Sequence, residues 1–175
     1  MMNRSQKYMA SVFRDHWSFI LIAVVTIVLD QITKILIVSN IALYHSIPAE
    51  GIIRLTHIVN TGSAFGLFQN QTTSLIMASV VGIFAIVFYY TTISKTRSFR
   101  WAMGLLLGGA IGNLIDRVIR GKVIDFVDVE LWPGFHFPAF NVADASINIG
   151  FFMILFLVLK SQIGKNRDDP SPVDD

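Results

Sequence analysis

The sequence predicts an all-α polytopic membrane protein with four transmembrane helices, a small strand-rich cap that faces outward, and an amphipathic outer segment. Of the 175 residues, 53% are hydrophobic and only 15% are charged, whereas about 25% of the residues of a soluble domain are charged. Four apolar stretches each approach the ~20 residues that a helix needs to cross a bilayer. The basic residues gather beside particular ends of these stretches, which predicts an orientation in the membrane.

The first span is expected at residues 17–38, with Trp17 as an interfacial anchor. Residues 1–15 are polar and carry basic side chains, as a short cytoplasmic arm does. A secretory signal sequence is also apolar, but no small-residue cleavage site ends this stretch and further spans follow it. We therefore interpret it as an integral helix.

The segment 39–73 is expected to form the outward-facing cap. It mixes polar and apolar residues and is interrupted by proline and glycine. Residues 52–59 are rich in β-branched side chains in a partly alternating pattern, which predicts a strand.

The remaining spans are expected at residues 74–93, 101–119 and 143–163. In the third span Gly104, Gly108 and Gly112 recur at every fourth position. This spacing of small residues lets helix backbones approach each other closely in lipid.

Residues 120–142 form the second outer segment, which is expected to be amphipathic. Among its aromatic residues, Trp132, Phe135 and Phe137 flank a Pro-Gly break. We interpret it as a gate resting in the headgroup layer. The charged, proline-containing tail 164–175 is expected to be disordered, and residues 1–175 to form a single membrane domain.

Most of the fourteen Lys and Arg residues lie in the two terminal regions and in the loop 94–100. By the positive-inside rule these parts are cytoplasmic, so segments 39–73 and 120–142 face outward. Polar residues of three spans and the adjoining segment then converge near the outer surface: Asp30, Lys34, Asn113, Arg117, Asp125 and Asp144. Snorkelling side chains would be distributed over both interfaces, so convergence at one depth favours a functional site.

Asp30 and Lys34 are four residues apart, which places them on one helix face and allows an ion pair. Alternatively, Lys34 snorkels to the outer headgroups with Asp30 neutralising it, and a pair of this kind can also brace neighbouring helices. Both interpretations remain open from the sequence. Asp116 and Arg120 are expected to mark the aqueous boundary.

Asn113 and Arg117 repeat the four-residue spacing on the third span. They could form an interhelical hydrogen-bond clamp, but we favour a role in contacting substrate.

Asp125 and Asp144 are candidates for a catalytic pair, because carboxylates are costly at a membrane margin. Two carboxylates close together share a proton, so one can act as a base on water while the other donates to a carbonyl oxygen. Asp144, near a helix N-terminus, would be the ionised partner. Asp128 and Glu130 are rivals to Asp125 that composition does not separate.

Other chemistries are weakly supported. Ser63 lies among small residues, as in an intramembrane serine protease. However, the histidines at positions 16, 45, 57 and 136 all fall outside the expected spans, so no histidine is placed within a span to act as the base that such a serine needs. There is no cysteine and no HExxH pair for zinc. A small proton-coupled transporter or a non-catalytic scaffold remains an alternative class.

Five segments resemble, in order, the motif blocks of the bacterial lipoprotein signal peptidases, also called signal peptidase II: residues 29–34, 60–65, 109–117, 123–126 and 140–144. Ser63 is a variant position, where the family often has alanine. The resemblance implies that Asp125 and Asp144 are the catalytic aspartates, in preference to Asp128. It also implies a substrate site formed by Asn60, Gly62, Asn113, Arg117 and Asn141, and a role in fold integrity for Asp30 and Lys34.

The resemblance further implies an aspartic endopeptidase that removes signal peptides from diacylglyceryl-modified prolipoproteins, cutting just before the lipidated cysteine. Such an enzyme lies in the bacterial cytoplasmic (inner) membrane with its active site near the outer surface. We expect prolipoproteins and membrane lipids as partners. We expect no nucleic acid, no cofactor, no metal, and a monomer.

Overall fold

The computed structural model describes residues 4–62, 71–93 and 96–168. Its four helices are α1 (Arg4–Asn40), α2 (Thr72–Thr92), α3 (Arg97–Arg120) and α4 (Val142–Asp168). Each contains a segment long and apolar enough to cross a membrane: His16–Asn40, Thr72–Thr92, Arg97–Arg120 and Val142–Ile163. The expected number of membrane helices is therefore confirmed.

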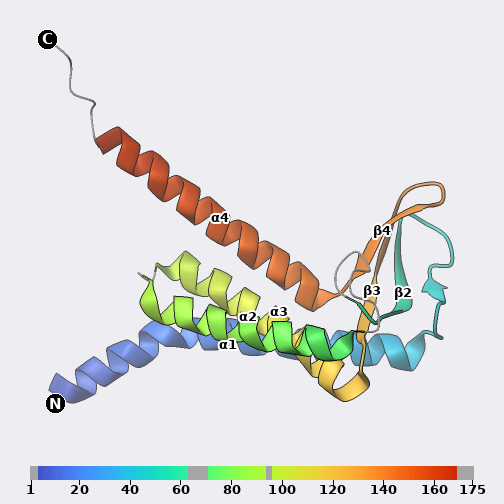
Figure 1. Ribbon diagram of the computed structural model, residues 1–175, viewed down its shortest axis with the longest axis horizontal. Helices are drawn as coiled ribbons and strands as arrows, with labels where there is room; N and C mark the ends of the chain where they lie inside the picture. The colour runs from blue at the N-terminus through green and yellow to red at the C-terminus, as the bar shows by residue number, and fades with distance from the viewer. Residues whose placement is uncertain (1–3, 63–70, 94–95, 169–175) are drawn as a thin grey trace, which may run out of the picture.

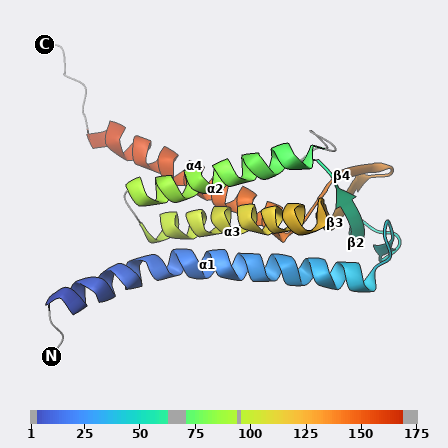
Figure 2. The ribbon, with the colours of Figure 1, turned by 60° about the horizontal axis from the view of Figure 1, so that its bottom comes forward.

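Helix α3 is central and packs against each of the other three helices. Figure 1 shows that α4 lies against the bundle near the sheet and diverges from it toward the end of the chain. The start of α1 and the end of α4 lie at the end of the bundle opposite the sheet, and Figure 2 shows the same arrangement from another side.

The four strands form one antiparallel sheet in the order β1 (Ser46–Ile47), β2 (Ile53–Asn60), β3 (Val123–Trp132), β4 (Phe135–Phe140). Strand β2 confirms the strand expected at residues 52–59. The two outer segments share the sheet, because β2 pairs with β3.

The sequence predicted an amphipathic segment over residues 120–142, and the structure shows that this segment forms the hairpin β3–β4, which was not expected. Its composition explains it, since Val123, Ile124 and Val127 favour extended backbone. The turn contains Gly134 at φ 79°, a left-handed conformation that glycine adopts without steric cost. The Pro-Gly break is thus a hairpin turn.

The terminal regions also differ from expectation. Helix α1 begins at Arg4, well before residue 17, and α4 continues to Asp168. The prediction of disorder is wrong for residues 164–168. Once a long helix has formed, each added residue extends it at little cost, so α4 continues beyond its apolar segment.

The glycine row of α3 faces α1. A Cβ atom added at Gly104 would lie 2.8 Å from the Phe19 carbonyl oxygen, and one at Gly108 would lie 2.6 Å from Thr26 Cβ. Similarly, a Cβ at Gly150 of α4 would lie 2.7 Å from the Ala102 carbonyl oxygen of α3. The absence of side chains at these positions therefore sets how closely α3 approaches both neighbours.

Two apolar clusters lie toward opposite ends of the membrane segment of α1, His16–Asn40. Phe19 packs with Tyr90, Phe99 and Met103 of α2 and α3. At the other end, Ile37 and Ile41 pack with Ile124 and Phe126 of β3. The second cluster fixes β3, and hence the segment around Asp125, against the end of α1.

The glycine row makes a testable prediction. Gly108→Ala places a methyl group against Thr26 and the Ala23 carbonyl, so it should destabilise the protein by about 1–3 kcal/mol through overpacking. Gly82→Ala in α2, where an added Cβ meets nothing within 4 Å, is the matched control. Thermal unfolding in detergent micelles measures both, and equal midpoints would contradict the close packing of α1 and α3.

Candidate active site

Asp144 is held at the start of α4 by its own capping interaction. The Asn141 side-chain oxygen accepts a hydrogen bond from the Asp144 backbone N–H at 2.9 Å, and an Asp144 carboxylate oxygen accepts one from the Asn141 N–H at 3.2 Å. This reciprocal pair is a capping box, with Asn141 preceding the first helical residue and Asp144 three residues later. The local sequence therefore fixes both the helix start and the carboxylate.

Asp125 lies on β3 and is only 2% exposed. Its two carboxylate oxygens accept hydrogen bonds from the side-chain amides of Asn60, at 2.9 Å, and Asn141, at 2.7 Å. Asn60 ends the neighbouring strand β2, and the Gly62 backbone N–H donates to its oxygen at 2.9 Å. Gly62 thus orients Asn60 so that its NH₂ group faces Asp125.

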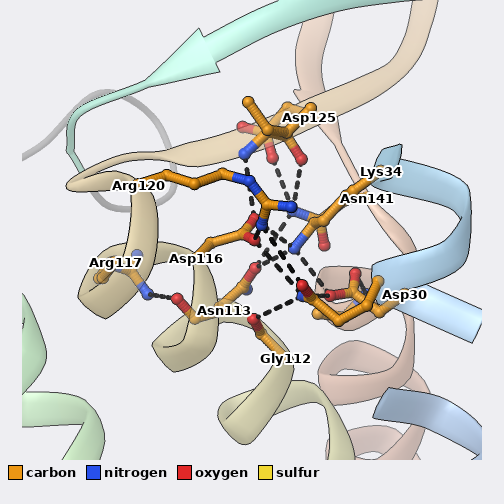
Figure 3. A network of polar contacts seen from close by, with 12 residues as sticks. Asp30, Lys34, Gly112, Asn113, Asp116, Arg117, Arg120, Asp125 and Asn141 are labelled. Carbon is orange, nitrogen blue, oxygen red and sulfur yellow. Dashed lines mark hydrogen bonds and ion pairs between the residues drawn. The ribbon is translucent and has the colours of Figure 1, made fainter. Parts of the chain in front are cut away.

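Two asparagines connect the two acids. Asn113 of α3 donates to an Asp144 carboxylate oxygen at 2.8 Å and accepts from the Asn141 side chain at 3.2 Å. Asn141 in turn donates to Asp125. Figure 3 shows Asn141 between Asp125 and Asn113.

Both acids line one cavity of about 920 Å³. The lining comes from α2, α3, α4 and three strands, and includes Asn60, Asn113 and Arg117. The Arg117 guanidinium donates weakly to the backbone oxygens of Gly62 and Asn113, both at 3.4 Å. Among the described residues its buried Nε finds no acceptor, so the guanidinium retains donor capacity.

The environment of Asp125 raises the pKa of its carboxyl to about 6. Burial is the largest cause, and the nearby Asp144 charge adds to it. The hydrogen bonds from Asn60 and Asn141 act in the opposite direction. Asp125 is therefore suited to exchange a proton near neutral pH.

Asp128, the rival to Asp125, is engaged elsewhere. It binds the Arg54 guanidinium at 2.7 Å and His136 Nδ1 at 2.8 Å, and accepts a hydrogen bond from Thr56. Burial raises the pKa of Asp128, but these hydrogen bonds outweigh it and hold the pKa below its usual range. Glu130, the other rival, accepts a hydrogen bond from the Gly134 N–H in the hairpin turn.

Asp30 and Lys34 lie beside this site in a fully buried ion network. The Lys34 ammonium is 2.8 Å from Asp30 and 2.8 Å from Asp116, and all three side chains are 0% exposed. The pair therefore braces α1 against α3, and Lys34 does not snorkel to headgroups.

The expectation that Asp116 and Arg120 mark the aqueous boundary is wrong for Asp116, which is fully buried and pairs with both Lys34 and Arg120. A signal was present in the sequence. Asp116 continues the four-residue row of Gly104, Gly108 and Gly112, and so lies on the face that packs against α1. Gln31, which donates to Asp30 and the Gly112 carbonyl, was also missed.

The serine at position 63 lies outside the described residues, as does the rest of the block 63–65. Within the described ranges no group of three or more His, Cys, Asp or Glu residues is arranged to hold a metal ion. His16 begins the first membrane segment, where its ring contacts the Tyr90 hydroxyl, and it does not line the cavity that holds the two acids.

The model of the family described as signal peptidase (SPase) II matches residues 22–160, most of the chain. The chain belongs to the signal peptidase II family. A lipoprotein signal peptidase of Desulforapulum autotrophicum is 37% identical over 82% of this chain and 92% of its own length. One of Janthinobacterium sp. (strain Marseille) is 40% identical over 82% of this chain and 88% of its own length.

Solved structures agree with the family assignment. A bacterial membrane enzyme structure determined by the in meso method at 2.3 Å has a TM-score of 0.79 and 32% identity, covering 89% of this chain and 94% of that one. A second, at 1.9 Å, has a TM-score of 0.73 and 33% identity, covering 81% and 92%. The fold of this chain is thus similar to that of two solved bacterial membrane enzymes.

The raised pKa of Asp125 makes stability depend on pH. The folded protein holds this proton more tightly than the unfolded chain, so the contribution is full below about pH 4 and is lost as pH rises through about 6. We expect the loss of this contribution, as the pH rises from about 4 to well above 6, to lower the free energy of unfolding by roughly 3 kcal/mol. The Asp125→Asn protein has no carboxyl group at this position, so it should not show this pH-dependent loss of stability.

Thermal unfolding of both proteins in micelles between pH 4 and pH 8 measures the difference. Parallel pH dependence of the two unfolding midpoints would show that Asp125 ionises in the folded state as it does in the unfolded chain.

Proposed function

We propose that this protein is a membrane aspartic endopeptidase that removes the signal peptide from diacylglyceryl-modified prolipoproteins, cutting just before the lipidated cysteine. Asp125 and Asp144 are its catalytic acids. The observation that carries the proposal is that both carboxylates line one cavity and are linked through Asn141 and Asn113 at one end of the helical bundle.

The chemistry follows from two acids that share one proton. The ionised carboxylate takes a proton from a bound water, whose oxygen attacks the scissile carbonyl carbon, while the protonated acid donates to the carbonyl oxygen. The resulting gem-diol collapses as the amide nitrogen is protonated and the C–N bond breaks. The products are a signal peptide with a free carboxyl group and a lipid-bearing cysteine with a free amine.

The cavity also fits a substrate that remains in the membrane. Its lining extends from the two acids to apolar residues on the membrane helices, among them Ile147 and Phe152 of α4 and Ala110 of α3. Acyl chains and an apolar signal peptide can lie beside these helices while the scissile bond reaches the acids. We assign the substrate site to Asn60, Asn113 and Arg117, which line the cavity, together with Gly62 and Asn141, which orient Asn60 and Asp125.

The protein lies in the bacterial inner membrane with both termini cytoplasmic and the sheet at the outer surface. The basic residues of the terminal regions and of the loop 94–100 support this orientation. The hairpin β3–β4 exposes Leu131, Trp132, Phe135 and Phe137, side chains suited to the headgroup layer. Phe137 also lines the cavity, so the hairpin acts as a gate over it.

The paired-acid mechanism predicts the outcome of conservative substitutions. Asp125→Asn and Asp144→Asn should each lower kcat by roughly 10³-fold or more, because each removes a proton-transfer group. Both proteins should remain folded and inserted. Asp128→Asn, on the same strand but paired with Arg54 and His136, is the control and should keep kcat within a few-fold of wild type.

Cleavage of a lipidated precursor by purified protein measures these rates. Full activity of either the Asp125→Asn or the Asp144→Asn protein would refute the mechanism.

The substrate assignment predicts that a diacylglyceryl-modified precursor is processed and that the same precursor without the lipid is not. Incubation of purified protein with both forms, scored by gel mobility, measures this. Processing of only the unlipidated form would refute the assignment even if both acids proved essential.

A further inference from the structure

Each of the two cavity acids follows directly after a residue whose backbone N–H is held by a different, fully buried carboxylate. The Ala143 N–H, just before Asp144, donates to an Asp30 oxygen at 2.9 Å. The Ile124 N–H, just before Asp125, donates to an Asp116 oxygen at 3.2 Å. The two acids lie on separate elements, α4 and β3, yet their backbones are anchored in the same way.

Lys34 joins the two anchors. Its ammonium is 2.8 Å from Asp30 Oδ2, 2.8 Å from Asp116 Oδ2 and 3.1 Å from Asn113 Oδ1. The ammonium donates hydrogen bonds to Asp30 and Asn113 and forms an ion pair with Asp116. One cation therefore links the anchor of Asp144, the anchor of Asp125 and the asparagine that bonds Asp144.

We propose that Asp30, Asp116 and Lys34 are positioning residues that set the relative placement of the two catalytic acids. Asp30 binds the backbone N–H just before Asp144, and Asp116 binds the backbone N–H just before Asp125. Lys34 of α1 pairs with both Asp30 and Asp116 and so links these two anchors across α1 and α3. This inference rests on the proposed function of Asp125 and Asp144.

Lys34 also determines how the Asn113 side chain is oriented. Because an ammonium only donates, Asn113 must present its oxygen to Lys34. Its NH₂ group is then directed to Asp144, to which it donates at 2.8 Å. Figure 3 shows Asn113, Lys34 and Asn141 meeting between the helices and β3.

The cost of the network supports a role beyond stability. Asp30, Asp116 and Lys34 are all 0% exposed, and Arg120 supplies the second cation that balances the two anions. Buried ion pairs of this kind are often no more stabilising than well-packed apolar residues, because desolvation offsets the attraction. Apolar side chains would supply no hydrogen-bond acceptors for the backbone N–H groups of Ala143 and Ile124.

A substitution at Gly112 can displace the Asp30 carboxylate, the anchor of Asp144, without removing a charge. A Cβ at this position would lie 2.7 Å from Asp30 Oδ2 and 3.3 Å from Ala143 Cβ. Gly108→Ala is the matched control, because it overpacks the same α1–α3 interface one turn away, against Thr26 and Ala23. The two variants differ in whether the added methyl group reaches the ion network.

The experiment compares kcat and KM of the two variants on a lipidated precursor, per folded molecule, with amide hydrogen exchange of residues 142–144. A misplacement of about 1 Å can cost about 10²-fold in rate. Gly112→Ala should therefore lower kcat at least tenfold with KM within about threefold, and should speed exchange at Ala143. Gly108→Ala should leave both readouts near wild type despite a similar loss of thermal stability.

Equal kcat values for the two variants, or a rise in KM alone, would overturn the positioning role. If Gly112→Ala does not fold, Asp116→Leu and Arg120→Gln provide the same comparison. Asp116→Leu removes the acceptor of the Ile124 N–H and should lower kcat, whereas Arg120→Gln retains that acceptor and should not. Active Asp125→Asn or Asp144→Asn proteins would instead refute the proposed function, so the two failures are distinguishable.

Discussion

The site depends on the hydrogen bonds of Asn141, a residue with no exposed surface. Its NH₂ group donates to Asp125, to Asn113 and to the Ile124 carbonyl, while its oxygen and backbone N–H form the capping pair with Asp144. A single side chain thus begins α4, orients one acid and contacts the other. Removing it would leave buried acceptors without donors, which is costly at a membrane margin.

The close approach of the helices makes this arrangement possible. Gly112 of α3 lies against Asp30 of α1, Asp116 one turn later pairs with Lys34, and Gly109 lies against the Ala143 carbonyl at the start of α4. In lipid, apolar contacts between helices gain little from excluding water, so close packing and polar contacts determine how helices associate. The glycines and the ion network therefore act together to place the start of α4 and the start of β3 side by side.

The sequence predicted the features that follow from local chemistry. Four long apolar stretches identified the membrane helices, β-branched residues identified β2, and two acids at span margins identified the candidate pair. The resemblance separated Asp125 from Asp128, and the contacts of Asp128 with Arg54 and His136 give a physical reason for that separation. Features that depend on tertiary contact were missed.

The pairing of β3 with both β2 and β4 requires knowing that the two outer segments meet. The burial of Asp116 requires knowing that the glycine face of α3 packs against α1, although its position in the four-residue row suggested this. The extension of α4 past residue 163 depends on helix propagation rather than on hydropathy. These errors concern how elements pack and where they end, whereas Asp125 and Asp144, the acids that the structure places in one cavity, could be listed in advance as candidates.

The central claim is that Asp125 and Asp144 act together to form and stabilise the tetrahedral gem-diol produced when water adds to the scissile carbonyl. It is tested most directly by the affinity of a lipidated peptide whose scissile carbonyl is replaced by a hydroxyl-bearing carbon, compared with the same peptide carrying a methylene group. Since transition-state analogues bind roughly 10²-fold or more tighter than substrates, we predict at least that advantage for the hydroxyl peptide. We further predict that it disappears in both Asp125→Asn and Asp144→Asn. Equal binding of the two peptides to the wild-type protein, or an advantage that survives loss of either acid, would contradict the paired-acid mechanism.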